Sequence, residues 1–389
     1  MRSDQIVNSS TFRSRARERV DIHRLTAAAT RFTIHHSPFT IHHSPFTTFL
    51  TAAATGLLLL LAAGARAQEA VREDVQFQKA FDGAVDRGLT YLAARQDTNG
   101  AWHHHTGITA LGVMAFLARG NVPGCGAYGA TIDRGIDFVL ASQDDKGTLI
   151  GLGSGQMYSH NIATLMLAEV SGMVDPPRQK RLDAVLPRAI QVTLAAQKVP
   201  KNAAMQGGWR YGPNATDSDI SHSGWAFMAL RSARNSGAPV PREAIDDGLR
   251  FIRRCATADG GFAYQPGGVS GLARTGAALL CIELSGEHRS PVTLKAGKHI
   301  QTIYSRCWPG HEMRYYGAYY VAQGMHQLGE QEWETFAPAF YRDLLALQQA
   351  DGAWRDMGAA EASAGPEYRT AMAILALSVS YRQLPIYQR

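Results

Sequence analysis

The chain of 389 residues is poor in the residues that mark metal, redox and nucleic-acid proteins. Its 4 cysteines, Cys125, Cys255, Cys281 and Cys307, form no CxxC pair, which excludes a zinc knuckle and a thioredoxin-type motif. Three of them lie inside or beside helical patterns, so we expect buried free thiols. Charged residues make up 19% of the chain and hydrophobic residues 45%, a balance that disfavours a disordered protein.

Positive charge is also scarce outside the N-terminal region. The formal net charge is +6, but residues 1–67 hold eight Lys or Arg against three Asp or Glu. The remaining 322 residues therefore carry a surplus of about one positive charge. This balance gives no support to a basic groove for a nucleic acid.

The N-terminal region has the composition of a leader. Residues 32–45 contain the sequence FTIHHSP twice without a change, which is typical of low-complexity sequence. The apolar run from Leu50 to Ala63 is short for a bilayer span. It is followed by Ala65-Arg66-Ala67, the small-x-small pattern that signal peptidase cuts. We expect a leader with a signal peptide over 1–67, cleavage near Ala67, and an exported mature chain, periplasmic or secreted, without a transmembrane span.

A repeated phrase organises the rest of the chain. Gln96–Trp102 reads QDTNGAW and Gln349–Trp354 reads QADGAW, with weaker copies within 143–147, 197–209 and 255–262. Each copy follows an amphipathic stretch and precedes an apolar stretch that ends in glycine, which suits the left-handed residue that closes a helix. Successive closing glycines are 43 to 65 residues apart, a spacing typical of repeats built from helix pairs.

The helical stretches are of two kinds. Residues 131–143 place Ile132, Ile136 and Leu140 on one face and charged residues elsewhere, as a surface helix does. Residues 224–230 are apolar all round and must be enclosed. The one-sided stretches lie near 74–96, 131–143, 180–197, 242–255, 292–306 and 332–349, and the enclosed ones begin near 107, 160, 221, 274, 316 and 369.

This alternation predicts a single all-α domain over 68–389, an α6/α6 double-walled toroid. The alternative, an open solenoid, would leave one apolar flank of the enclosed helices exposed to water.

The Gln…Asp-Gly-x-Trp phrase in an α/α ring resembles the prenyltransferase/squalene oxidase repeat of squalene–hopene cyclases and protein prenyltransferase β subunits. The resemblance covers about residues 75–389. It implies that Gln96, Trp102, Gln349 and Trp354 tie helix ends together.

Polar residues gather where the enclosed helices are expected to begin. Asp217-Ser218-Asp219 resembles the Asp-x-Asp-Asp motif with which class II terpenoid cyclases protonate an alkene or epoxide. The resemblance implies that Asp219 is the proton donor, tuned by Asp217 and His222, because burial and a second carboxylate keep such an acid protonated. Two features depart from the family: residue 220 is Ile, and the chain has length for one helical domain where those cyclases use two. The structural alternative is that Asp219 is an N-cap.

A carbocation requires a lining rich in aromatic faces. The residues that we expect to line the cavity are Trp209, Tyr211, Trp225, Phe262, Arg274, Tyr315, Tyr316, Tyr368 and His160. We assign no cofactor and no metal.

Zinc is the minor alternative, bound by His103, His104 or His105 together with His160 or His222. The Asp-x-Cys zinc pair of protein prenyltransferases is missing, since Leu279 stands two residues before Cys281 and neither Cys255 nor Cys307 has an Asp at that position.

Three functions stay open. The first is acid-initiated cyclisation or isomerisation of an apolar isoprenoid-like molecule. The second is a non-catalytic ring that binds a lipid, peptide or protein. The third, glycan cleavage, needs two carboxyl groups across a cleft, such as Asp217 with Glu312 or Glu367.

Overall fold

The computed structural model describes residues 77–388, except 151–155, 309 and 311–312. Residues Val71–Arg389 form one compact unit. The expected leader and signal peptide over 1–67 lie outside the described residues. In the part that the structure describes, β structure is limited to isolated bridges, such as the one between Gln348 and Trp354.

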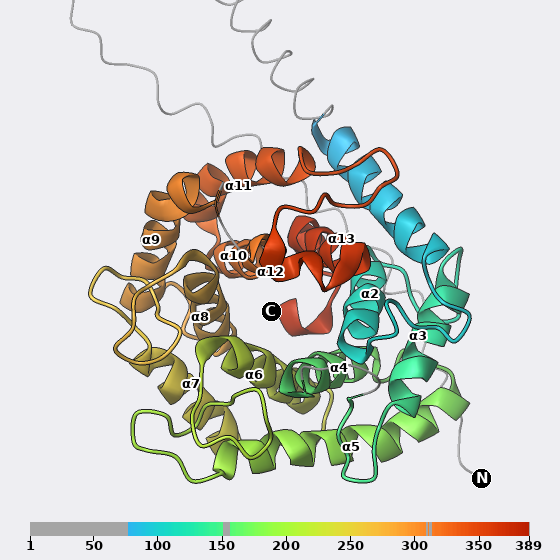
Figure 1. Cartoon of the computed structure of the whole chain (residues 1–389), viewed down its shortest axis with the longest axis horizontal. Helices are drawn as coiled ribbons and strands as arrows, with labels where there is room; N and C mark the ends of the chain where they lie inside the picture. Colours follow the sequence, from blue (N-terminus) through green and yellow to red (C-terminus); the bar gives the residue numbers. More distant parts are fainter. Residues whose placement is uncertain (1–76, 151–155, 309, 311–312, 389) are drawn as a thin grey trace, which may run out of the picture. The chain divides into compact units, whose positions relative to one another are not determined.

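Six inner helices form a closed ring (Figure 1). They are α2 (Thr106–Ala118), α4 (Gln156–Val170), α6 (Ile220–Asn235), α8 (Leu272–Leu284), α10 (Arg314–Leu328) and α13 (Gly365–Leu377). Each contacts the next in this order, and α13 contacts α2, which closes the circle. The closure confirms the predicted toroid and excludes the open solenoid.

The outer wall surrounds this ring. It consists of a helix over residues 77–94, then α3 (Gly129–Ala141), α5 (Pro176–Lys198), α7 (Arg242–Arg254), α9 (Pro291–Cys307) and α11 (Glu330–Leu345). The short elements α12 (Ala359–Ala362), η2 (Ser378–Tyr381) and η3 (Pro385–Tyr387) complete the described fold.

The two walls differ in what their helices bury. Helix α7 buries Ala244, Gly248, Phe251 and Ile252, which form one stripe at helical spacing, and directs its charged residues to solvent. Helix α2 buries every one of its residues, because it packs against α3 outside, α4 and α13 on either side, and the lumen within. The one-sided or all-round distribution of apolar residues therefore corresponds to the outer or the inner layer of helices.

The repeated glutamine joins successive helix pairs. The Gln96 Nε2 donates to the carbonyl oxygens of Gly100 (3.0 Å) and Thr131 (2.9 Å), so it ties its own turn to the next outer helix. In the last repeat this role belongs to Gln348, whose Nε2 donates to Gly352 O (3.1 Å) and Ala84 O (2.7 Å). The expectation for Gln349 is wrong, because the bond to the turn glycine spans four residues in both repeats.

The repeated aromatic residue ties the same turn back to the outer wall. Its indole N–H reaches back to the preceding outer helix, from Trp102 Nε1 to Leu92 O (2.7 Å) and from Trp354 Nε1 to Leu344 O (2.9 Å). The structural role expected for both tryptophans agrees with these bonds.

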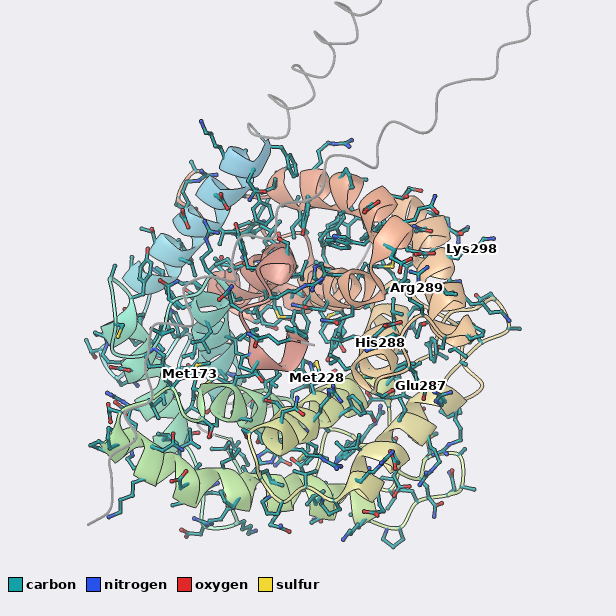
Figure 2. All side chains as sticks on the ribbon, turned by 180° about the vertical axis from the view of Figure 1, so that it is seen from behind. Met173, Met228, Glu287, His288, Arg289 and Lys298 are labelled. Atoms are coloured by element: carbon teal, nitrogen blue, oxygen red, sulfur yellow. The ribbon has the colours of Figure 1, made fainter. Side chains whose placement is uncertain are left out.

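The last described residues, including η3, lie inside the ring (Figure 1). Side chains also fill the lumen there: Figure 2 places Met228 near the axis and Lys298 at the outer edge. Among the described residues, no helix is both long and apolar enough to cross a membrane.

Candidate functional site

A cavity of about 620 Å³ opens where the inner helices begin. Five aromatic side chains form much of its wall: Tyr158, Tyr211, Trp225, Tyr316 and Tyr368. Aliphatic side chains from α2 and α4 complete the apolar surface: Ile108, Leu111 and Ile162. The polar rim includes three consecutive histidines, His103, His104 and His105. The cavity is thus an apolar pocket with a polar entrance.

Four of the expected lining residues lie in this wall: Tyr211, Trp225, Tyr316 and Tyr368. Tyr316 and Tyr368 come from the first turns of α10 and α13, and Trp225 from the second turn of α6. Their hydroxyl and indole groups are spread around the ring because, among the described lining residues, every inner helix except α8 contributes its N-terminal end.

Trp209 and Phe262 do not line the cavity, contrary to expectation. Both occupy the turn position that locks inner to outer wall. The shared feature is a backbone N–H that donates to a hydroxyl of the following inner helix, from Trp102 to Thr109, Trp209 to Ser223, Phe262 to Thr275 and Trp354 to Thr370. This position faces the space between the walls, so its aromatic ring packs there.

Three other expected lining residues also lie elsewhere. The Tyr315 hydroxyl donates to Arg355 O (2.6 Å), and the Arg274 guanidinium packs beside Gly271. His160 is fully buried, with Nδ1 accepting from Leu149 N (3.1 Å) and Nε2 3.0 Å from Ala189 O. Burial lowers the pKa of His160 to about 4, so the ring is neutral and its Nε2 donates. These bonds occupy both ring nitrogens, and no metal ligand is left.

Asp219 is the N-cap of α6 and is fully buried. Its Oδ1 accepts from His222 N (2.9 Å), and its Oδ2 accepts from Arg210 Nη1 (2.9 Å) and His222 Nδ1 (2.8 Å). Burial raises the pKa of Asp219, but the hydrogen bonds and charge of His222, with the Arg210 guanidinium, outweigh it and leave the pKa below its usual range. A carboxylate held in its ionised form does not suit the expected role of protonated donor.

Asp217 lies on the solvent side of the same arginine. Its Oδ2 is 3.1 Å from Arg210 Nε, and its side chain is 46% exposed. The structure therefore brings Asp217 and Asp219 to the same Arg210 guanidinium, and it brings His222 to Asp219.

The His222 imidazole lies between two tyrosine rings of the cavity wall. Its centroid is 3.8 Å from that of Tyr158 and 4.1 Å from that of Tyr211. Because ionised Asp219 accepts from the Nδ1–H group, Nε2 is the ring nitrogen left to exchange a proton. This Nε2 is buried and has no hydrogen-bond partner among the described residues. A carboxylate–imidazole pair such as Asp219 and His222 can take up and deliver a proton.

Glu361 of α12 is a cavity residue that the sequence did not reveal. Its Oε1 accepts from Tyr316 N (2.9 Å) and its Oε2 from Tyr315 N (3.0 Å), so it caps α10 from outside. Burial raises the pKa of Glu361 against the lowering effect of these bonds. Glu361 belongs to a short connection that carries no repeat pattern. Its position at the cavity therefore depends on the closed tertiary structure and not on a local sequence signal.

The rim histidines do not converge on one point. His103 Nδ1 is 4.0 Å from Glu367, and His104 Nδ1 is 3.4 Å from Asp97. Within the residues described here, no three His, Cys, Asp or Glu side chains come close enough together to hold a metal ion.

Solved structures share this fold. One is a variant of the type II terpene cyclase MstE from Scytonema in complex with geranylgeranyl dihydroxybenzoate, with a TM-score of 0.53 and 11% identity over 80% of this chain and 100% of that one. Another is a glycosidase variant, with a TM-score of 0.53 and 13% identity over 79% of this chain and 98% of that one. At these identities the likeness establishes the α/α toroid fold alone. No protein-family model and no curated protein sequence matches the chain.

Proposed function

We propose that the toroid binds an apolar, isoprenoid-like small molecule in the cavity at the start of the inner helices. The observation that carries the proposal is a cavity of about 620 Å³ walled by five aromatic side chains. Its volume lies within the usual range of small-molecule sites, about 300–1,000 Å³, which are also mostly apolar with a few polar groups.

The wall suits a branched hydrocarbon. Burial of apolar surface contributes roughly 25 cal/mol for each Å² removed from water, and aromatic faces also attract positive charge. The histidines of the rim would meet a hydroxyl or phosphate head group at the entrance. The terpene cyclase neighbour, whose bound molecule carries a geranylgeranyl chain, is consistent with this ligand class.

Glycan cleavage fits the site less well, because it needs two carboxyl groups that face one cleft. Among the described lining residues, Glu361 supplies the one carboxyl. Glu367 is bonded to Arg95 Nε (3.2 Å), and Asp217 is bonded to Arg210. Glu312 lies outside the described residues.

The second candidate is an isomerase that acts on the same ligand. It is favoured by the buried Nε2 of His222 behind the aromatic wall. In this mechanism a protonated His222 gives its Nε2 proton to an alkene, and the cation returns a proton to the same nitrogen. Asp219 stabilises the imidazolium instead of donating, and the net reaction needs no co-reactant.

Binding is tested by titrating the purified full chain with geranylgeraniol and measuring the dissociation constant by calorimetry. Trp225→Leu removes a wall ring and should weaken binding by at least about tenfold, or about 1.4 kcal/mol. Trp333→Leu is the matched control, because Trp333 belongs to outer helix α11 and does not line the cavity. Equal affinity of all three proteins would refute the cavity as the binding site.

Reaction is tested on the same proteins by chromatography of the extracted ligand. Isomerised product from the wild type and none from His222→Gln would support the second candidate. Unchanged ligand from the wild type would leave binding as the function.

A further inference from the structure

The segment after η2 enters the ring from the end opposite the cavity. Within this tail segment, residues 384–388, the side chains of Leu384, Ile386 and Tyr387 are buried. Its backbone is held by the far ends of two inner helices: Glu169 of α4 accepts from Ile386 N (3.1 Å), and Gln327 Nε2 of α10 donates to Tyr387 O (3.2 Å). The tail segment is therefore an ordered, hydrogen-bonded part of the structure inside the ring.

One aromatic layer separates the tail segment from the cavity. The Tyr387 hydroxyl is hydrogen-bonded to the Tyr319 hydroxyl. The Tyr319 ring stacks on Trp225, with centroids 5.1 Å apart and planes 8° apart. Trp225 in turn lines the cavity. A continuous column of three aromatic side chains thus runs from the cavity wall to the tail.

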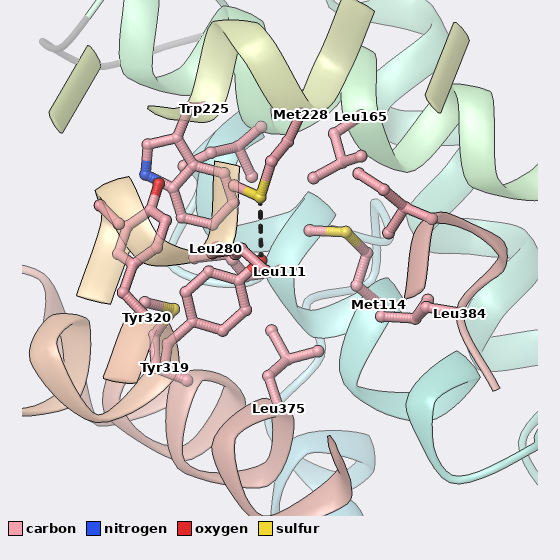
Figure 3. Packing of buried hydrophobic residues seen from close by; sticks show 14 of the residues in the cluster. Leu111, Met114, Leu165, Trp225, Met228, Leu280, Tyr319, Tyr320, Leu375 and Leu384 are labelled. Carbon is pink, nitrogen blue, oxygen red and sulfur yellow. Dashed lines mark hydrogen bonds between the residues drawn. The ribbon is translucent and has the colours of Figure 1, made fainter. Parts of the chain in front are cut away.

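The surroundings of this column are apolar. Figure 3 shows Met114, Met228 and Leu375 near Tyr319, with Leu384 beyond Met114, and the Tyr319 hydroxyl hydrogen-bonded to the Met228 sulfur. An empty space with such a lining stays dry and accepts apolar ligands. Removing the Tyr387 ring would therefore leave an apolar space below Tyr319, into which the Tyr319 and Trp225 rings can shift to deepen the cavity.

We propose that the tail segment supports the floor of the cavity and that Tyr387, by holding the Tyr319 and Trp225 rings in place, sets the length of the ligand that the toroid accepts. This inference rests on the proposed binding function. The tail is suited to the role because it is a separate element: the contacts that close the ring of inner helices do not involve it. The ring of inner helices can therefore stay folded when a change in the tail segment alters the depth of the cavity.

The test compares dissociation constants of the full chain for three isoprenoid alcohols of increasing length, farnesol, geranylgeraniol and solanesol. The variants are Tyr387→Ala, which removes the ring, and Tyr387→Phe, which removes only the hydroxyl. Gln383→Ala is the surface control, since Gln383 is an exposed residue just before the tail segment. A stop codon after Arg382 removes the tail altogether, and melting temperatures identify folded variants. If the truncated chain does not fold, Tyr387→Ala is the decisive variant. If Tyr387→Ala does not fold either, Leu384→Ala replaces it.

We expect the wild type, Tyr387→Phe and Gln383→Ala to favour one alcohol of the series. Tyr387→Ala and the truncated chain should shift the preference toward a longer alcohol by at least about tenfold, because extra buried methylene groups add to affinity. An unchanged order of affinities in folded Tyr387→Ala would overturn the inference while leaving the binding function intact. Absence of binding for every alcohol in every protein would overturn both.

Discussion

Asp219 Oδ2 lies 2.8 Å from His222 Nδ1, and neither side chain is exposed to solvent. The relationship assigns different roles to the two residues, because an ionised carboxylate beside Nδ1 fixes the imidazole and leaves Nε2 as the atom that can exchange a proton. Arg210 balances the charge from the other side of the carboxylate.

Asp219→Asn should destabilise the protein far more than Asp217→Asn. Asparagine still caps a helix, so the loss comes from the charge that pairs with Arg210 and His222. Removing one partner of a buried pair costs about 3–5 kcal/mol, whereas a half-exposed pair contributes about 0–1 kcal/mol. Urea unfolding of both variants measures the difference. Equal losses would mean that the Asp219 cluster is not a buried ion pair.

Tyr211→Ala should make His222 reactive. Tyr211 is 51% exposed and covers the imidazole, so its removal opens a path from solvent to Nε2. Treatment with diethyl pyrocarbonate followed by peptide mass spectrometry should show modification of His222 at least about tenfold faster than in the wild type. His160 is an internal control, because its Nε2 donates to Ala189. If His160 reacts equally fast, the variant has opened globally and Tyr211 is not a local cover.

Glu169→Gln should remove a pH dependence of stability. Burial raises the pKa of Glu169 from an ordinary 4.5 to about 7. Below pH 4.5 the group is protonated in both states; as the pH rises toward about 7 only the unfolded chain releases the proton, so stability falls, and above about 7 the loss is complete. The loss amounts to about 3 kcal/mol at 1.36 kcal/mol per pKa unit.

Glutamine keeps the acceptor for Ile386 N and has no proton to lose. Between about pH 4 and about pH 8 the decrease in the free energy of unfolding should therefore be about 3 kcal/mol larger in the wild type than in the variant. The neighbouring phenols of Tyr319 and Tyr387 do not interfere, because burial raises the pKa of both further above neutrality. Parallel curves for the two proteins would contradict the burial of an ionisable Glu169.

Gln348→Ala should destabilise the ring, and Gln349→Ala should not. The Gln348 amide donates to Gly352 O and Ala84 O, and loss of the amide leaves those carbonyl oxygens without this donor. The expected cost is about 1–3 kcal/mol, measured by thermal or urea unfolding. A larger effect at Gln349 would restore the assignment made from the repeat phrase.

The sequence predicted the ring because the signal was physical and repeated. One-sided stretches such as 242–255 became outer helices, here α7, and enclosed ones became inner helices, because an apolar surface must be covered. The start of α13 was less well placed: it begins at Gly365, ahead of the expected 369, since Pro366 suits a first helical turn.

The cavity was predicted less completely. Tyr316 and Tyr368 belong to inner helices, so their placement followed from the ring. Trp209 and Phe262 were misplaced although they stand at the same repeat position as Trp102, which faces the space between the walls. Glu361 carries no repeat pattern, so no local signal could bring it to the site. The tail segment around Tyr387 likewise has no local sequence signal that would place it in the lumen.

Photo-crosslinking can locate an isoprenoid chain in the aromatic cavity. The full chain is incubated with a geranylgeraniol analogue that carries a photoreactive group in its hydrocarbon tail, irradiated and mapped by peptide mass spectrometry. We expect crosslinks to Trp225, Tyr316 or Ile162, and their loss on competition with unlabelled geranylgeraniol. Crosslinks confined to the outer wall, or unaffected by competition, would contradict binding in this cavity.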